Sequence, residues 1–589
     1  MGQKSNSKKN SKKKIQLQPK KETKKEHLKL KEHLVHKKVN KQAIFGGVLV
    51  LIMVTLLITI GYLLFNKAFK PQSVAKILPE KNVIALIDIN SNFEHSQIIK
   101  SMDLLKNYPE YSKESLLKFV ETQFGVSYEK DLKSWIGRSI GIVFWASDEE
   151  GGMSKLYFAE VASQVNAKLM LGKEKNINYD GYTIYKMNDR TYAVFMDEYV
   201  FIAHEEGSIK ELINSGKAGG ELLYSADKYR RIDDNMPINK AAFLYVNFEK
   251  INNGFIKNFP ILSEQGLSIE SLSPFLEVFK AEGFSLIALD DNFVIQSFLS
   301  LDPERLEGSQ YITFKEKYNA KLADYVATDT MAFWGGVNLE YQLKRLVEVF
   351  SGGNEDAVAF INALIQNYVK KYFGSDMDFS RDVLPLLGKE FALAVEQIDG
   401  KNVYKVLLEL ENPEEDESML KNIAEKFVKN GGAFDPKIVE HTLSDGTVSR
   451  EIIAVAEVVE QSDSAYKDVT IHEIKIGQKE WGIYYVIIGD VAVIATHIDG
   501  VKNSIDIEKG GKSSLKSTAI FDYQIAPIID NSDEITYFNF KKLLPLLLKE
   551  NSLNKYLKPI ESFSSGKNYF NDGVVTINYL HIDGQCLKK

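Results

Sequence analysis

Hydrophobic and polar positions divide this chain into one long apolar run near the N-terminus and a body in which they alternate. The run, residues 43–65, is AIFGGVLVLIMVTLLITIGYLLF and holds no charged residue, Asn, Gln or Pro. As a helix it would reach about 34 Å, enough to cross a hydrocarbon core of about 30 Å. It is longer than a signal-peptide core and no small-residue cleavage site follows it. We therefore predict a retained, single transmembrane helix over 43–65.

The body alternates between strand-like and helix-like patterns. An apolar strand at Val83–Ile89 opens it, and a helical region follows, with apolar residues clustered over 98–120. Further strands follow, separated by short turn signals such as DEEGG and DG, which favour antiparallel hairpins. They are expected at Ser139–Trp145, Lys155–Val161, Tyr182–Met187, Tyr192–Met196 and Tyr199–His204. The pattern predicts an α+β fold, with antiparallel sheets and helices packed on them.

The pattern of the body recurs once along the chain. Landmarks repeat in the same order, and the second set is displaced by about 250 and later by about 290 residues. The matched landmarks include Ala75–Val83 with Ala323–Met331, Phe124-Gly125 with Phe373-Gly374, Gly137 with Gly388, His204 with His497, and Asn247 with Asn539. The extra length in the second set falls where a helix-like segment, Glu415–Lys429, replaces a short stub. We predict a tandem duplication, 73–310 and 318–589, after a linker at 66–72.

Two of these stretches carry a family resemblance. LPEKNVIALIDIN, shortly after the apolar run, and DVLPLLGKEFALAVE at 382–396 resemble the bacterial family with domain of unknown function 3352. The second copy fits the family pattern better, because the first has Ser134 where Pro385 stands in the second. The resemblance implies a bacterial envelope protein and supplies no catalytic residues.

Charge separates the two ends of the protein. Residues 1–42 contain fifteen Lys and three Glu, a balance of +12, so the remaining chain carries −7 − 12 = −19. The excess of lysine before the run predicts a cytoplasmic N-terminus, with residues 66–589 on the outer side of the plasma membrane. We expect the largely disordered tail, 1–42, to lie on anionic lipids of the inner leaflet. It has no interleaved aromatic residues or arginines, so no nucleic-acid partner is expected.

Candidate catalytic chemistry is sparse. His204 and His497 occupy matched places beside acidic residues, but no paired metal-ligand spacing and no nucleophile motif accompanies them. The run from Asp376 to Asp382 places oxygens at alternate positions, as a calcium loop does, but has Arg381 where that loop needs Gly. Asp131 and Asp382 are better explained as caps of a short helix. We assign no catalytic, cofactor-binding or metal-binding residues and predict no enzymatic activity.

These observations predict an extracytoplasmic binding or scaffolding module with an envelope protein, lipid or glycan as partner. A concave seam between two lobes would be the default site. Tyr182, Tyr185, Tyr192 and Tyr199 could line a carbohydrate- or peptide-binding face, although packing within strands explains them more simply. Two other classes stay open: an envelope hydrolase or cell-wall enzyme, and a lipid-handling protein with an apolar cavity. Cys586 is the only cysteine, so no disulfide forms within the chain.

Overall fold

A computed structural model describes most of residues 73–582, and the longer stretches outside the description are 252–277, 307–316 and 548–558. The predicted tail, transmembrane helix and linker, together with Cys586, lie outside the described residues. None of the helices in the described part is both long and apolar enough to cross a bilayer. Residues 71–589 form one compact unit.

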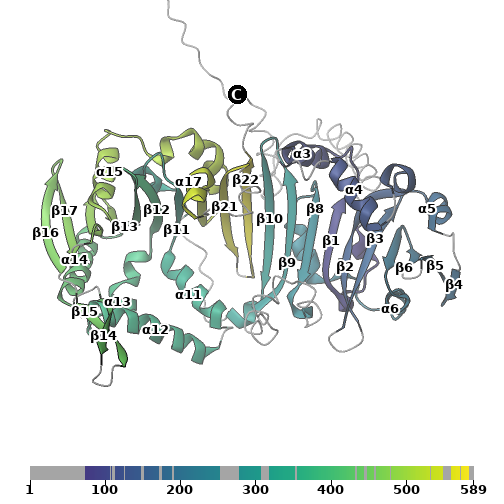
Figure 1. Cartoon of the computed structure of the whole chain (residues 1–589), viewed down its shortest axis with the longest axis horizontal. Coiled ribbons are helices and arrows are strands. Elements are labelled where there is room, and N and C mark those ends of the chain that lie inside the picture. The colour runs from purple at the N-terminus through teal and green to yellow at the C-terminus, as the bar shows by residue number, and fades with distance from the viewer. Residues whose placement is uncertain are drawn as a thin grey trace, which may run out of the picture. The chain divides into compact units, whose positions relative to one another are not determined.

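A twenty-stranded antiparallel sheet dominates this unit, with helices packed against it (Figure 1). The predicted mixed architecture of antiparallel strands and helices is therefore confirmed. The first ten strands are β1 (Val83–Asn90), β2 (Ile136–Ala146), β3 (Met153–Val161), β4 (Asn176–Tyr179), β5 (Tyr182–Asn188), β6 (Thr191–Met196), β7 (Tyr199–Ala203), β8 (Ala242–Asn247), β9 (Phe279–Ala288) and β10 (Asn292–Leu301).

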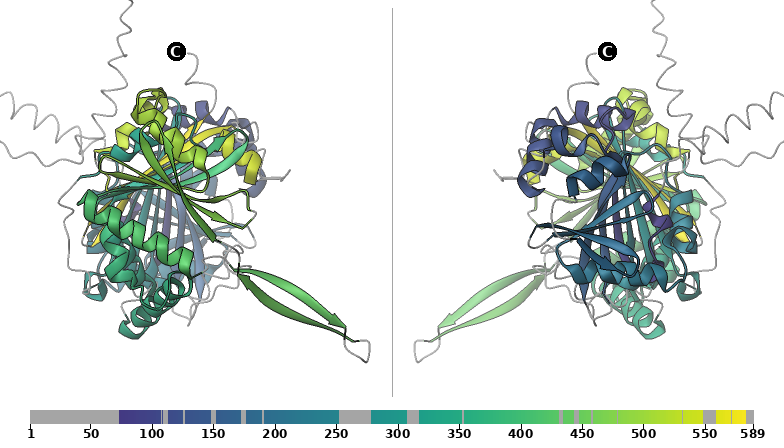
Figure 2. Two further views of the ribbon diagram at one scale, coloured as in Figure 1. Left: turned by 90° about the vertical axis from the view of Figure 1, so that its left-hand side faces the viewer. Right: turned by 90° about the vertical axis from the view of Figure 1, so that its right-hand side faces the viewer.

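The second half of the chain contributes ten further strands to the same sheet. They are β11 (Ala332–Val337), β12 (Glu390–Ile398), β13 (Lys401–Glu409), β16 (Val459–Tyr466), β17 (Val469–Ile476), β18 (Gly482–Ile488), β19 (Val491–Ala495), β20 (Glu534–Asn539), β21 (Ile560–Phe570) and β22 (Gly573–Ile582). A separate hairpin, β14 (Phe434–Thr442) and β15 (Val448–Ala456), projects from this half in Figure 2.

The two halves pair their strands in the same order. In the first half the order is β4-β5-β6-β7-β3-β2-β1-β8-β9-β10. In the second it is β16-β17-β18-β19-β13-β12-β11-β20-β21-β22. Strands β10 and β22, which end these two series, pair antiparallel with each other. The sheet therefore continues from one half into the other, and the expected seam between separate lobes is replaced here by a strand pair.

The strand register matches as well as the order. Ala85 lies opposite Phe144 and Val246 in the first half, and Ala332 lies opposite Val395 and Phe538 in the second. Counting along the strands from these residues places Asn247 level with Asn539 and Gly137 level with Gly388. At the junction Gln296 faces Ile577, and both residues are fifth in their strands.

The helices lie between strands at corresponding places. Those of the first half are α3 (Ser96–Leu105), α4 (Lys113–Phe124), α5 (Gln164–Leu171), α6 (Glu206–Lys217) and α7 (Asp227–Asp234). Those of the second are α11 (Leu339–Ser351), α12 (Glu355–Phe373), α13 (Phe379–Asp382), α14 (Pro413–Lys429), α15 (Ile498–Glu508), α16 (Ala526–Ile529) and α17 (Phe540–Leu547). The predicted helical segment Glu415–Lys429 lies within α14, where Pro413 suits the first turn because a helix leaves that N–H unpaired.

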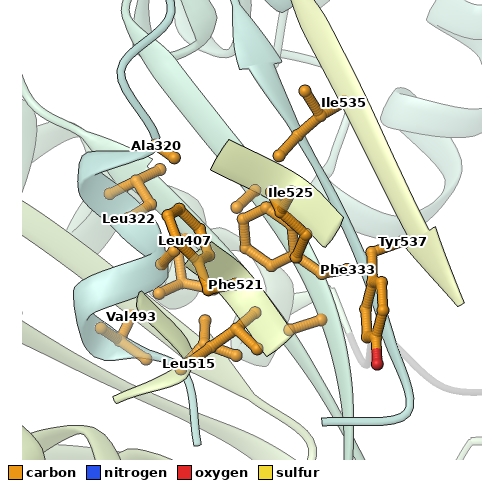
Figure 3. Packing of buried hydrophobic residues seen from close by; sticks show 14 of the residues in the cluster. Ala320, Leu322, Phe333, Leu407, Val493, Leu515, Phe521, Ile525, Ile535 and Tyr537 are labelled. Atoms are coloured by element: carbon orange, nitrogen blue, oxygen red, sulfur yellow. The ribbon is translucent and has the colours of Figure 1, made fainter. Parts of the chain in front are cut away.

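Each half has its own principal hydrophobic core. In the first half, Leu78, Trp145, Leu156 and Leu212 are buried together. In the second, Leu322 and Leu515 pack with Phe333, Leu407 and Phe521, as Figure 3 shows. Both cores lie between the sheet and a short helix that precedes the first strand of that half, η1 (Val74–Lys76) or η8 (Lys321–Tyr325). Burial of this apolar surface is the main term that stabilises such a sheet.

Candidate functional site

A surface pocket of about 480 Å³ lies in the second half. Its walls come from the end of η8, the end of α15 and the segment that follows α15. The lining residues are Asp324, Tyr325, Ile507, Glu508, Lys512, Ser513, Ser514 and Ser517. The pocket thus combines hydroxyl groups, both signs of charge and one aromatic ring.

Backbone contacts hold the walls of the pocket in place. Gly510, with φ of +74°, turns the chain after α15, a conformation that glycine adopts at little cost. Ser514 then forms a β-bridge with Ala327, and the Leu515 N–H donates to the Val326 carbonyl at 2.7 Å. Because Leu515 is buried in the core, the pocket stands on a rigid base.

Behind the pocket lies a fully buried ion pair. Lys405 on β13 and Glu396 on β12 have no exposed side-chain surface, and their charged atoms are 2.8 Å apart. The Lys405 ammonium also donates to Ser504 Oγ at 3.0 Å, and Glu396 accepts from the backbone N–H of Ala327 at 2.8 Å. Burial lowers the pKa of Lys405, and the Glu396 carboxylate opposes this shift.

Hydrogen bonds connect the ion pair to two walls of the pocket. On one side, Lys512 Nζ donates to Asn503 Oδ1 at 2.7 Å, and Asn503 Nδ2 lies 3.4 Å from Glu396 Oε2. On the other side, Ser504 Oγ donates to the Tyr325 carbonyl at 2.7 Å. The contacts run from Lys512 through the ion pair to Tyr325, so a change at either wall reaches the same buried charges.

The equivalent positions of the first half are apolar. From the matched register, Trp145 stands level with Glu396 and Leu156 with Lys405. Leu212 in α6 and Ser504 in α15 lie at the same distance from the starts of their helices. All three first-half residues are buried: Trp145 is 0% exposed, Leu156 0% and Leu212 1%. This fold therefore does not need an ion pair at that place, and we treat the polar cluster as a feature of the second half alone.

The lining residues offer both donors and acceptors. Asp324 pairs with Lys516 at 3.2 Å, and Lys512 lies 3.5 Å from Asp506. Ser513 and Ser517 are exposed, and the Ser517 hydroxyl donates to the Ser514 carbonyl at 2.6 Å. Such a lining suits a small polar ligand that can both donate and accept hydrogen bonds.

The histidines selected from the sequence lie in different surroundings. His204 follows β7 and packs edge-on against Tyr157 at 6.0 Å, whereas His497 is the N-cap of α15. Strand register places His204 level with Thr496, since Ala203 and Ala495 correspond, so the predicted match between the two histidines is one residue off. His204 and His497 belong to opposite halves of the sheet. Among the described residues, no group of three or more His, Cys, Asp or Glu is arranged to hold a metal ion.

The acidic run before β12 is occupied by contacts within the protein. Asp376 pairs with Lys426 at 3.1 Å, Asp378 caps α13, and Arg381 binds Asp382. Asp382 accepts from the N–H of Asp378, four residues earlier, and Asp131 accepts from that of Ser127 in the same way. These carboxylates therefore accept from N–H groups that precede them in the chain. The predicted capping of the helix that runs into Gly388 is wrong, because the N-cap of Leu384–Leu387 is Val383, which makes no side-chain hydrogen bond.

The tyrosines do not form one aromatic face. Tyr182, Tyr192 and Tyr199 pack in the principal core of the first half. Tyr185 points to the other side of the sheet and contacts Phe195 edge-on at 5.5 Å. Packing within strands, the simpler explanation, is therefore correct.

Sequence reasoning missed Lys405, Glu396 and the pocket. A lysine within a strand such as β13 is expected on the exposed face, yet Lys405 is 1% exposed. The one available signal is the comparison of the two halves, which sets Leu156 against Lys405. That comparison needs the strand register, and the changing offset between the halves conceals it.

Fold and site together define a mixed α/β protein built on one large antiparallel sheet, with a polar pocket in its second half. The family model described as "Protein of unknown function (DUF3352)" matches residues 43–436, and the chain belongs to this family. The predicted resemblance is confirmed. No curated protein matches the chain.

Solved structures give only a distant likeness. "Structure of crystal form I of TP0453" is 11% identical, with a TM-score of 0.23, over 42% of this chain and 83% of that one. "Structure of crystal form III of TP0453" gives 11% identity and a TM-score of 0.23 over 41% and 83%. Neither likeness bears on what this protein does.

Proposed function

We propose that this protein is a binding module of the bacterial envelope, anchored by residues 43–65, with its N-terminus in the cytoplasm and residues 66–589 outside. The lysine-rich tail and the uncharged run that follows it support this placement. A protease added outside intact cells should digest the body and spare residues 1–42. Digestion of the tail alone would overturn the orientation.

We also propose that the body arose by tandem duplication of one unit, 73–310 and 318–589. The equal strand order and the equal register positions of Asn247 and Asn539 support this origin. One copy keeps an apolar core where the other carries Glu396 and Lys405. Divergence of this kind is expected when one copy maintains the fold and the other acquires a binding site.

The pocket beside Tyr325 and Lys512 is the proposed binding site, and the buried ion pair connected to its walls is the observation that carries the proposal. Desolvating a lysine and a carboxylate is costly, and apolar residues fill the same place in the first half. We infer that the cluster serves to hold Lys512 and Tyr325 in position for a small polar ligand, without catalysis.

The test uses the full chain in detergent and a panel of sugars, amino acids and polyamines. Ligand binding should raise the melting temperature in proportion to concentration. Lys512→Ala should weaken the affinity about tenfold or more, because it removes a charged hydrogen-bond donor. Lys217→Ala, at an exposed lysine that pairs with Asp180 in the first half, is the matched control. Equal loss in both variants, or no ligand that depends on Lys512, would refute the site.

A further inference from the structure

Helix α12 carries an apolar stripe that faces solvent. Phe360 is 64% exposed, Leu364 43% and Tyr368 64%. Their spacing of four residues places them on one side of the helix. Other parts of α12 contact α11 and α14, so the helix is docked on the protein through its opposite side. Exposed apolar side chains in such a row mark an interaction surface.

Helix α12 is neutral overall, because Glu355 and Asp356 in its first turn balance Lys370 and Lys371 near its end. Residues 357–373, AVAFINALIQNYVKKYF, contain no Asp or Glu, whereas residues 43–589 together carry −19. Lys370 and Lys371 are exposed in the last turns of the helix. An apolar stripe with lysines beside it suits an anionic surface that is also apolar beneath its charges.

The corresponding helix of the first half lacks the two lysines, although by the sequence match its Phe119 stands level with Tyr368. Phe124-Gly125 matches Phe373-Gly374, so Glu121 and Thr122 in α4 stand level with Lys370 and Lys371. Helix α4 covers Lys113–Phe124, while α12 covers Glu355–Phe373 and is longer. The second half therefore departs from the first at exposed charged positions here, and at buried ones beside the pocket.

We propose that α12 lies on the surface of an anionic lipid bilayer, with Phe360, Leu364 and Tyr368 among the headgroups and Lys370 and Lys371 near lipid phosphates. The inference rests on the proposed anchor. The linker, 66–72, spans at most about 25 Å when extended, so the anchor keeps the start of the body close to the membrane. A row of aromatic and leucine side chains beside lysines is the kind of surface that lies in the headgroup region of a bilayer.

The experiment uses the full chain with Cys586→Ser, reconstituted into phosphatidylcholine vesicles with or without phosphatidylglycerol. Leu364→Cys carries an environment-sensitive fluorophore, and the vesicles contain a lipid-borne quencher. Lys118→Cys, at an exposed position of α4, is the matched control. We expect loss of emission and a blue shift for the label at position 364 when phosphatidylglycerol is present, and little change at position 118. The variant Lys370→Glu/Lys371→Thr, which copies the first half, should abolish that loss.

Other outcomes overturn the proposal. Equal quenching at both positions shows that contact with the bilayer is not specific to α12, and no quenching at position 364 shows that α12 does not meet the bilayer. Disulfide-linked dimers of the unlabelled Leu364→Cys variant, formed in proportion to protein density, show that a second copy covers the stripe instead. Extraction with alkaline carbonate tests the anchor separately, so a chain that resists extraction without quenching refutes this proposal and leaves the proposed function standing.

Discussion

At the residue scale, the pair of Lys405 and Glu396 makes the sharpest prediction. Lys405→Met leaves the Glu396 carboxylate buried without its counter-charge, and such a loss typically costs about 3–5 kcal/mol. Urea unfolding of the full chain in detergent should show this decrease in the free energy of unfolding.

The double variant Glu396→Gln/Lys405→Met provides the comparison. The glutamine oxygen still accepts from the N–H of Ala327, and no charge stays buried. We expect it to recover roughly half or more of the lost stability. If the double variant is no more stable than Lys405→Met, the cost does not come from the unpaired carboxylate.

The buried carboxyl group of Glu390 should make the stability of the fold depend on pH. Burial raises its pKa to about 7 from 4.5, although backbone N–H groups of Leu322 and Lys321 donate to its carboxylate. Between these values the folded chain holds a proton that the unfolded chain has released. This group therefore stabilises the fold fully below about pH 4.5, and that contribution, up to about 3 kcal/mol, is lost as the pH rises through 7.

Glu390→Gln tests this, because the amide can still accept from Leu322. The variant should be more stable than the wild type at pH 8, and its stability should fall less between pH 5 and 7. Some slope should persist, since burial also raises the pKa of Asp88 to about 6 and of Glu282 to about 7. An unchanged slope would mean that Glu390 is ionised at little cost in the folded state.

At the element scale, much of the fold could be read from the sequence. The strand predicted at Val83–Ile89 is β1, those predicted at Ser139–Trp145 and Lys155–Val161 lie in β2 and β3, and the extra helix of the second half is α14. These elements can be predicted because the spacing of their apolar residues, visible in the sequence, is typical of a strand or a helix.

The pairing of distant strands and the candidate site could not be read in this way. Gln296 and Ile577 meet across the junction, and neither residue's neighbours in the sequence indicate a partner so far away. The ion pair likewise depends on which face of β13 is buried. That face is fixed by register against β12 and β19, not by the pattern within the strand.

Strands β1 and β2 approach each other closely at Gly141, and this leads to a prediction for β2. At Gly141, a Cβ atom would lie 1.9 Å from the carbonyl oxygen of Ile87 and also meet the ring of Phe158. Gly141→Ala should therefore destabilise the protein by about 1–3 kcal/mol, as overpacking does. Gly207, in the first turn of α6, has no atom within 4 Å of such a Cβ. Gly207→Ala should be neutral or slightly stabilising in the same unfolding measurement.

At the scale of the whole molecule, the two halves share one sheet through β10 and β22. Because these strands are level with each other in the two series, two copies of the first half could pair β10 with β10 in the same register. We expect residues 73–306, produced alone, to form a symmetric dimer, detectable by sedimentation. The pairing would bury the edge that β22 normally covers. Replacing Ser297 in the middle of β10 by Pro should return the fragment to a monomer.

If the unmodified fragment is a monomer with an intact fold, the edge of β10 is protected even without β22.

In the full chain, Ser297→Pro weakens the β10–β22 ladder, so we expect this variant to unfold in two steps, one for each half. A single transition in that variant would show that contacts other than the β10–β22 ladder couple the halves.

The same junction fixes the order in which the chain can fold. The residues joined at its centre are 577 − 296 = 281 positions apart, and β22 is the last strand of the sheet. Closing so long a loop is entropically costly and slow, so the junction should form after each half has collapsed on its own core. During synthesis the first half is made before β22 exists. Its free edge must then wait for the end of the chain, and in that interval the nascent protein is most exposed to mispairing with a neighbour.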